Sequence, residues 1–185
     1  MKEFNDHYRK VASTRYRKTL DFLKNKVSKS EVILDLGPPN PLSEIMRNEG
    51  FQVFNTQPDV DLDFDFSIVK DEKFDVVTAF EVLEHMVSPF PLLCKINAKK
   101  LLASVPLRYW FKSAYWNEND PYDRHFHEFE PRQFDMLLLK SGWEIKSSEK
   151  WISKTQNIGI RPLLRNITPR YYIVYCERKE FAGFK

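Results

Sequence analysis

The sequence predicts a three-layer α/β domain built on a mostly parallel sheet. Short apolar runs rich in β-branched residues alternate along the chain with segments whose apolar residues recur every three or four positions. Glycine or proline stands at several of the boundaries between these segments, as expected for tight connections. Alternation of strands and helices is typical of parallel sheets covered by helices.

The clearest unit is a strand, a helix and a second strand near the N-terminus. The run EVILDL (31–36) ends at Gly37, a helix is expected from Pro41 to Gly50, and FQVFN (51–55) follows as a strand. Such a βαβ unit places its two strands parallel through a right-handed crossover. An apolar stripe over residues 4–27 predicts a helix within an N-terminal extension, residues 1–28.

The remaining pattern predicts four more strands and two more helices. The strands are expected at 74–80, 100–105, 143–151 and 171–178, and the helices at 89–97 and 131–142. We expect 107–130 and 153–170 to be irregular loops on the substrate side of a single domain, residues 1–185.

Composition excludes several classes of protein. Of the 185 residues, 42% are hydrophobic and 30% are charged, which is typical of a folded globular domain. A net charge of +3 gives no indication of nucleic-acid binding by itself, and no apolar run is long enough to span a membrane. The cysteines, Cys94 and Cys176, lie in apolar runs, so we expect two buried, reduced thiols and a cytoplasmic protein.

Candidate chemistry follows the predicted strands, because ligands bind beyond the carboxyl ends of parallel strands. One group is an acid beside a glycine after the first strand, Asp35 and Gly37. The others are an acidic, aromatic stretch over 61–66, the pair Glu81 and Glu84 with His85, and the histidines His125 and His127. On its pattern alone, the acidic stretch is better explained as a short edge strand with a polar side. The two histidines could bind a metal together with Asp123 or His85, but no spacing matches a zinc motif, so no metal is expected.

Two longer segments resemble a known family. FDVVTAFEVLEHMVSPFPLL (74–93) and DRHFHEFEPRQFDMLLLKSGWEI (123–145) are similar to class I S-adenosylmethionine-dependent methyltransferases of the branch with an E-V-L-E-H motif, the type 11-like enzymes. The resemblance covers about residues 31–150. It implies a Rossmann-like sandwich with an antiparallel last strand, S-adenosylmethionine as the cofactor and a small-molecule methyl acceptor.

The resemblance also implies roles for individual residues. Asp35 and Gly37 would lie near the methionine part of the cofactor, and Asp63 would accept from the adenine amino group with Phe64 beside the ring. Phe80 and Glu81 would line the cofactor floor. His125 and His127 are the candidate general bases, with a structural role in orienting the 107–130 loop as the alternative.

The sequence departs from the family pattern at the glycine-rich turn. Pro38 and Pro39 stand where backbone N–H donors are usual, and no acid ends the second strand at Asn55 to hold the ribose. These departures keep open a cofactor-impaired binding or partner module. Scattered arginines are the support for a nucleic-acid methyltransferase, the less favoured alternative.

Overall fold

Six strands form one mixed sheet in the structure, a computed structural model that describes residues 2–155 and 157–179. The strands are β1 (Val32–Asp35), β2 (Gln52–Asn55), β3 (Val76–Phe80), β4 (Lys100–Pro106), β5 (Trp143–Trp151) and β6 (Tyr171–Arg178). Their order is β2-β1-β3-β4-β6-β5. β1 to β4 run parallel, whereas β6 is antiparallel to both of its neighbours. The predicted strands and the antiparallel last strand are therefore confirmed.

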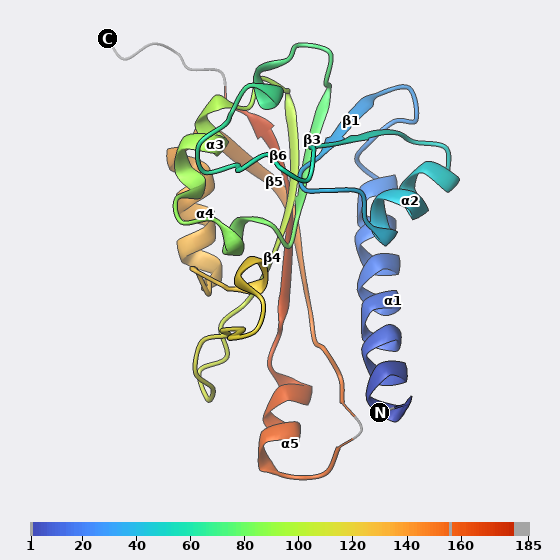
Figure 1. Cartoon of the computed structure of the whole chain (residues 1–185), viewed down its shortest axis with the longest axis vertical. Coiled ribbons are helices and arrows are strands. Elements are labelled where there is room, and N and C mark those ends of the chain that lie inside the picture. Colours follow the sequence, from blue (N-terminus) through green and yellow to red (C-terminus); the bar gives the residue numbers. More distant parts are fainter. Residues whose placement is uncertain (1, 156, 180–185) are drawn as a thin grey trace.

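Helices cover both faces of the sheet and complete three layers (Figure 1). The helices are α1 (Lys2–Lys24), α2 (Pro41–Asn48), α3 (Pro89–Lys95), α4 (Pro131–Lys140) and α5 (Ile160–Ile167), with short 3-10 turns at Ile68–Lys70, Leu83–His85 and Pro121–Asp123. α1 and α2 pack on one face, and α3 and α4 pack on the other. The expected α/β sandwich is confirmed.

Alternating strand residues supply the two cores. Ile33 packs with the residues of α1 and α2, whereas Leu34 packs on the opposite face with those of α3 and α4. Val76 and Val77 divide in the same way. Successive side chains of a strand point to opposite faces, so each apolar run of the sequence serves both layers. Burial on both faces explains why these strands read as continuous apolar runs.

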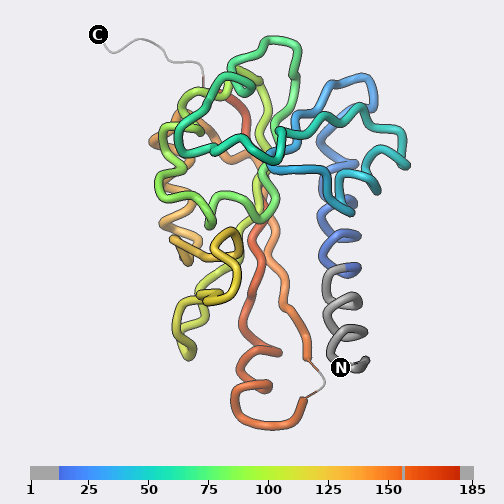
Figure 2. Tube along the Cα trace, in the orientation of Figure 1, coloured from blue at the N-terminus to red at the C-terminus, as the bar shows by residue number. Residues whose placement is uncertain are grey.

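The loop over residues 107–130 returns to the sheet immediately after β4. Leu107 pairs with Phe129 in an isolated β-bridge, and the Arg108 N–H donates to the Phe129 carbonyl. Figure 2 shows this segment on the same side of the sheet as α4. The bridge brings the two ends of the loop together beyond the carboxyl end of β4, where a ligand site is expected.

Two expectations were wrong. The segment 153–170 contains helix α5, although it was expected to be irregular. Its apolar stripe is not buried, since Ile160, Leu163 and Ile167 are 80%, 64% and 66% exposed. Cys176 is buried as expected, but Cys94 is exposed. Within the described residues, no helix has the length and apolar character required to cross a bilayer.

Candidate active site

Asp35 ends β1 in a fully hydrogen-bonded position. Its carboxylate accepts from Thr78 Oγ1 at 2.6 Å and from the side-chain amides of Asn40 and Asn55 at 3.2 Å each. The sheet register places Asp35 directly opposite both Asn55 and Thr78. The side chain is 2% exposed, and burial raises the pKa of Asp35 to about 6.

Side chains hold the turn after β1 in place of the family's additional glycines. The Gly37 N–H donates to Thr56 Oγ1 at 2.9 Å, and Asn55 Nδ2 donates to the Gly37 carbonyl at 3.2 Å. Asn40 caps α2, accepting from the backbone of Leu42 and Ser43. Gly37 has a φ of 99°, a left-handed conformation that favours glycine. The proline-rich turn is therefore firmly built, with its polar groups already paired.

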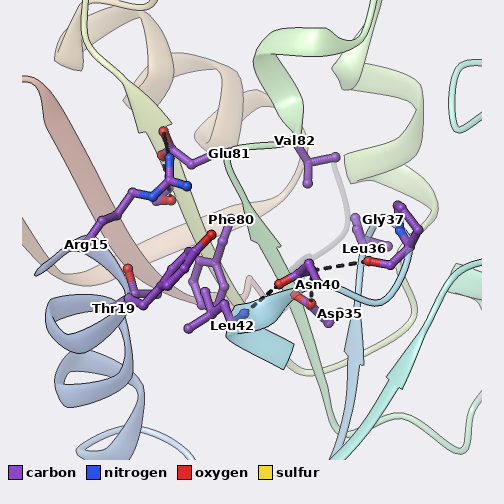
Figure 3. Close-up of a pocket in the computed structure, with 13 residues that line it drawn as sticks. Arg15, Thr19, Asp35, Leu36, Gly37, Asn40, Leu42, Phe80, Glu81 and Val82 are labelled. Carbon is purple, nitrogen blue, oxygen red and sulfur yellow. Dashed lines mark hydrogen bonds and ion pairs between the residues drawn. The ribbon is translucent and has the colours of Figure 1, made fainter. Parts of the chain in front are cut away.

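A cavity of about 240 Å³ lies beside this turn at the carboxyl ends of β1 and β3 (Figure 3). Three of the expected cofactor residues besides Asp35 line it: Gly37, Phe80 and Glu81. Arg15 reaches the cavity from α1 and approaches Glu81 Oε2 to 3.5 Å. The structure therefore brings most of the expected cofactor residues together.

Glu81 has an unusual backbone for a non-glycine residue. Its φ is 57°, in the left-handed region, which costs of order 1 kcal/mol or more for such a residue. Ser104 Oγ donates to Glu81 Oε1 at 2.9 Å, and the Glu81 N–H donates to the Ser104 carbonyl at 3.0 Å. Burial raises the pKa of Glu81, and the Arg15 guanidinium opposes this rise. A strained, buried carboxylate at a strand end is typical of functional sites.

Asp63 and Phe64 lie outside the residues that line this cavity. The two Asp63 carboxylate oxygens accept from the N–H groups of Val87 and Ser88, at 2.9 Å each, at the start of α3. Phe64 is 84% exposed. Asp63 therefore has a clear structural partner, and its contact with adenine stays a prediction.

The histidine loop docks onto the E-V-L-E-H segment through backbone hydrogen bonds. The Glu84 carbonyl accepts from the N–H groups of Phe126 and His127, at 2.8 and 3.2 Å. His85 Nδ1 donates to the Arg124 carbonyl at 3.1 Å. These bonds bring together two segments some forty residues apart in the sequence.

This docking creates a cluster of Glu84, His85 and His125. One possible ligand atom from each lies within 4.8 Å of the others. Glu84 is 1% exposed, and neither its Oε2 nor His125 Nδ1, both buried, has a hydrogen-bond partner. Burial and the nearby Glu81 carboxylate raise the pKa of Glu84, whereas burial and the charge of His85 lower the pKa of His125 to about 4. Both shifts favour neutral side chains when the cluster is empty.

His127 points elsewhere. Its Nε2 donates to the Val87 carbonyl at 3.1 Å, and its ring stacks on Phe129 with the centroids 5.4 Å apart. Of the two candidate bases, the structure therefore places His125 in the polar cluster and His127 in a packed, hydrogen-bonded position.

The cluster could also hold a divalent cation. Because His85 Nδ1 donates to a carbonyl, its Nε2 carries the lone pair, and this nitrogen is 3.8 Å from Glu84 Oε1. Two histidines and a carboxylate are a ligand set that proteins use for zinc and for other transition metals. The expectation of no metal considered the two histidines with His85 or Asp123 but not with Glu84, which the structure places beside His85 and His125.

Comparison with known proteins gives the family. The profile of a methyltransferase domain family matches residues 6–148. The chain belongs to this methyltransferase family. No curated protein matches the sequence.

Three solved structures are similar to this methyltransferase. A SAM-dependent methyltransferase from Archaeoglobus fulgidus has a TM-score of 0.59 and 17% identity, with 92% of this chain and 94% of that chain covered. An S-adenosylmethionine-dependent methyltransferase from Mesorhizobium loti gives 0.53 and 15%, with coverage of 85% and 96%. A 1,6-didemethyltoxoflavin-N1-methyltransferase from Burkholderia thailandensis, solved with S-adenosylhomocysteine, gives 0.56 and 14%, with coverage of 96% and 90%. The resemblance to the class I S-adenosylmethionine-dependent methyltransferases is confirmed.

S-Adenosylmethionine is the cofactor of this family, and the cavity offers groups that suit it. A Cβ placed on Gly37 would meet only Val82 Cγ2, at 4.0 Å, so a ligand can approach the backbone closely. Arg15 and Glu81, whose side chains approach to 3.5 Å, lie together at the cavity with Asp35 apart from them, and these groups offer the opposite charges that suit an amino-acid group.

Sequence reasoning missed Arg15 as a cavity residue and Glu84 as the buried centre of the cluster. Arg15 is one of several basic residues on α1, and nothing in the neighbouring sequence distinguishes it from the others. Only the packing of α1 against the strand ends distinguishes it. For Glu84, the adjacent apolar Leu83 and Val82 were a signal of burial.

Proposed function

We propose that the protein transfers a methyl group from S-adenosylmethionine to an oxygen atom of a small-molecule acceptor. The observation that carries this proposal is the adjacency of two features: a cavity with paired charges at the strand ends, and a cluster with unpaired buried polar atoms beside it. The first suits a zwitterionic cofactor, and the second suits an acceptor that must lose a proton.

The cofactor supplies an electrophilic methyl group on a sulfonium. Arg15 would bind the cofactor carboxylate, and Glu81 or Asp35 would face its ammonium group, which fixes the methyl group toward the cluster. The acceptor oxygen would lie beside Glu84 and His125. As the new O–C bond forms, the C–S electron pair remains on sulfur, and the acceptor proton moves to a group of the cluster.

A metal-free cluster and a metal-bound cluster would handle this proton differently. With a pKa of about 4, His125 is a weak proton acceptor at neutral pH, so Glu84 is the stronger base of the pair when ionised. A bound cation would instead lower the pKa of the acceptor hydroxyl directly. Methyl transfer measured with and without a chelator separates the two.

Calorimetric titration with S-adenosylmethionine and S-adenosylhomocysteine tests the proposal. We expect saturable binding in the micromolar range, because Pro38 and Pro39 provide no N–H donors and each lost charge-assisted hydrogen bond weakens binding by about one to two decades. Absence of binding by the folded protein would favour the alternative of a binding or partner module. Submicromolar binding would contradict the expected weakness of the turn but support the activity.

A further inference from the structure

A second cavity, of about 320 Å³, lies between the segments 107–113 and 153–170. Four cationic side chains and one carboxylate line it: Lys112, Arg161, Arg165, Arg170 and Glu128. Hydroxyl and amide groups of Ser113, Thr155 and Asn157 complete its polar wall. The cationic side chains outnumber the single carboxylate, so the cavity carries an excess of positive charge.

The charged groups of this cavity differ in how far they are already paired. Arg170 is neutralised in place, since its Nη1 lies 3.9 Å from Glu128 Oε1 and donates to the Leu107 carbonyl. By contrast, neither Arg161 nor Lys112 forms a salt bridge within the part of the chain that the structure describes. The excess charge is therefore available to a ligand.

Two buried donors in the wall, Arg165 Nε and the Tyr109 hydroxyl, make no hydrogen bond of normal geometry, although the two side chains lie close enough to interact with each other. Arg165 Nη2 donates to Ser153 Oγ at 3.2 Å, but its Nε is buried and makes no hydrogen bond. The Tyr109 hydroxyl is also buried without a hydrogen bond of normal geometry. A buried donor that lacks a well-placed acceptor is unfavourable, so an acceptor-rich ligand would improve the hydrogen bonding of both groups.

The cavity shares a wall with the polar cluster. The Tyr115 N–H donates to Glu128 Oε1 at 2.9 Å, and the Tyr115 ring lies 4.7 Å from the ring of His125. Tyr115 therefore lies between the two sites, and an acceptor held by the arginines would reach Glu84 and His125 by extending past this side chain. This arrangement separates an anchoring site from the reacting site, as methyl transfer between positioned reactants requires.

We propose that this basic cavity binds a phosphate group carried by the small-molecule methyl acceptor. That the phosphate belongs to the methyl acceptor rests on the proposed function, but phosphate binding by the cavity does not depend on it. Arginine guanidinium groups match phosphate oxygens in pairs, and hydroxyl donors complete such a site. A phosphate, with two negative charges and several acceptor oxygens, fits the excess charge better than a single carboxylate does.

Titration with inorganic phosphate at constant ionic strength tests the site without cofactor or methyl transfer. Arg161→Gln and Arg165→Gln should each weaken phosphate binding about tenfold, because each removes a charge-assisted contact. Tyr109→Phe should weaken it less. Arg132→Gln is the matched control, since Arg132 is exposed on α4 and lies outside the cavity. Arg161 is exposed, so its variant is expected to fold even if Arg165→Gln does not.

Equal phosphate affinity in Arg161→Gln and Arg132→Gln would overturn the proposal. So would a short single-stranded RNA that binds through the same arginines more than tenfold tighter than phosphate, because the acceptor would then be a nucleic acid. Cofactor titration of the same variants separates this inference from the proposed function. Phosphate binding without cofactor binding would retain the site and remove the methyltransferase proposal.

Discussion

The cofactor side and the acceptor side of this methyltransferase differ in how completely their polar groups are paired. Around the β1 turn, Asp35 accepts three side-chain hydrogen bonds, and even the Gly37 N–H has a side-chain partner. Around the histidine loop, buried polar atoms of Glu84 and His125 have none, and in the β5–β6 connection Arg165 Nε has no hydrogen bond of normal geometry. The polar groups named on the cofactor side have hydrogen-bond partners within the protein, whereas those named on the acceptor side do not.

This difference indicates on which side of the site a ligand would supply hydrogen-bond partners that the protein itself does not. Buried polar groups in folded proteins are almost always hydrogen-bonded, so unpaired ones have an explanation in strain, an ion or a ligand. On the cofactor side, a ligand must rely on Arg15, Glu81 and the open approach to Gly37. On the acceptor side, a ligand or cation would provide partners for the buried polar atoms that make no hydrogen bond within the protein. We therefore expect substitutions on the acceptor side to affect catalysis most.

The largest expected effect is on methyl transfer in His125→Ala and Glu84→Gln. We expect Glu84→Gln to reduce kcat by about a hundred- to ten-thousandfold, the range for loss of a group that handles the acceptor proton, and His125→Ala to reduce it less. Cofactor affinity should change by less than about twofold, because neither residue lines the cofactor cavity. The measurement is methyl transfer to an acceptor turned over by the native protein, alongside calorimetry with S-adenosylhomocysteine.

His127→Ala provides the comparison. Because the His127 side chain is hydrogen-bonded to the Val87 carbonyl and stacked on Phe129, its removal should lower kcat less than His125→Ala does. Equal losses would remove the distinction between the two histidines. Thermal melting with zinc or manganese extends the test. A metal that raises the Tm of the native protein but not that of His125→Ala would identify the cluster as a cation site.

The next effect is on stability as a function of pH, through Asp35. Burial raises the pKa of Asp35 from 3.8 to about 6, so the folded protein binds this proton more tightly than the unfolded chain. The stabilisation is fully present below pH 3.8 and is lost as pH rises through about 6. The shift corresponds to at most about 3 kcal/mol of unfolding free energy.

Urea unfolding of the native protein and of Asp35→Asn between pH 4 and 7.5 measures this effect. The difference in unfolding free energy between the two proteins should change with pH, while contributions from other groups cancel. A constant difference across this interval would show that Asp35 titrates normally. The constant offset itself carries no information, because Asn cannot reproduce every hydrogen bond of Asp35.

The fold could be predicted from the sequence because its signals are local. Continuous apolar runs end at Gly37 or Pro106, and helices begin at Pro41 and Pro131, so residues adjacent in sequence marked each boundary. The prediction failed for α5, whose stripe is present but points to solvent. Its pattern predicts a helix, yet Pro162 near its start and the surrounding polar residues resembled a linker.

The site could be predicted only in part, because its contacts join distant segments. Asp35, Gly37, Phe80 and Glu81 were identified since strand ends meet at one edge of a parallel sheet. The choice between His125 and His127 depends on which of the two side chains joins the cluster with Glu84 and His85. The docking of the histidine loop onto the E-V-L-E-H segment decides this, and it does not follow from the local sequence. Asp63 could not be placed from its neighbours, because its partners lie more than twenty residues away.

On the cofactor side, Arg15→Gln should weaken cofactor binding by about 1.5–3 kcal/mol through loss of a charge-assisted hydrogen bond. The Arg15–Glu81 contact, at 3.5 Å, is long but largely buried, with the two side chains 25% and 14% exposed, so its loss should also lower the unfolding free energy, and cofactor binding is compared between variants shown to be folded. Arg17→Gln is the matched control, because Arg17 is exposed on the same helix and lies outside the cavity. Equal cofactor affinities of the two variants would remove Arg15 from the site.

The smallest expected effect is on the stability of Asp63→Ala. The Asp63 carboxylate accepts from two N–H groups at the start of α3, so its removal should lower the unfolding free energy by about 1–2 kcal/mol, as for the loss of a helix cap. Asp61→Ala and Asp65→Ala are neighbours of equal charge that each accept from one loop N–H, of Asp63 and Ser67 respectively. They should cost less, because each loses one side-chain hydrogen bond where Asp63→Ala loses two. Urea unfolding of the three variants measures this order.

Calorimetry on the same proteins tests the adenine contact: an affinity loss of about 1.5–3 kcal/mol confined to Asp63→Ala would support it. Equal affinities would leave Asp63 with the structural role alone.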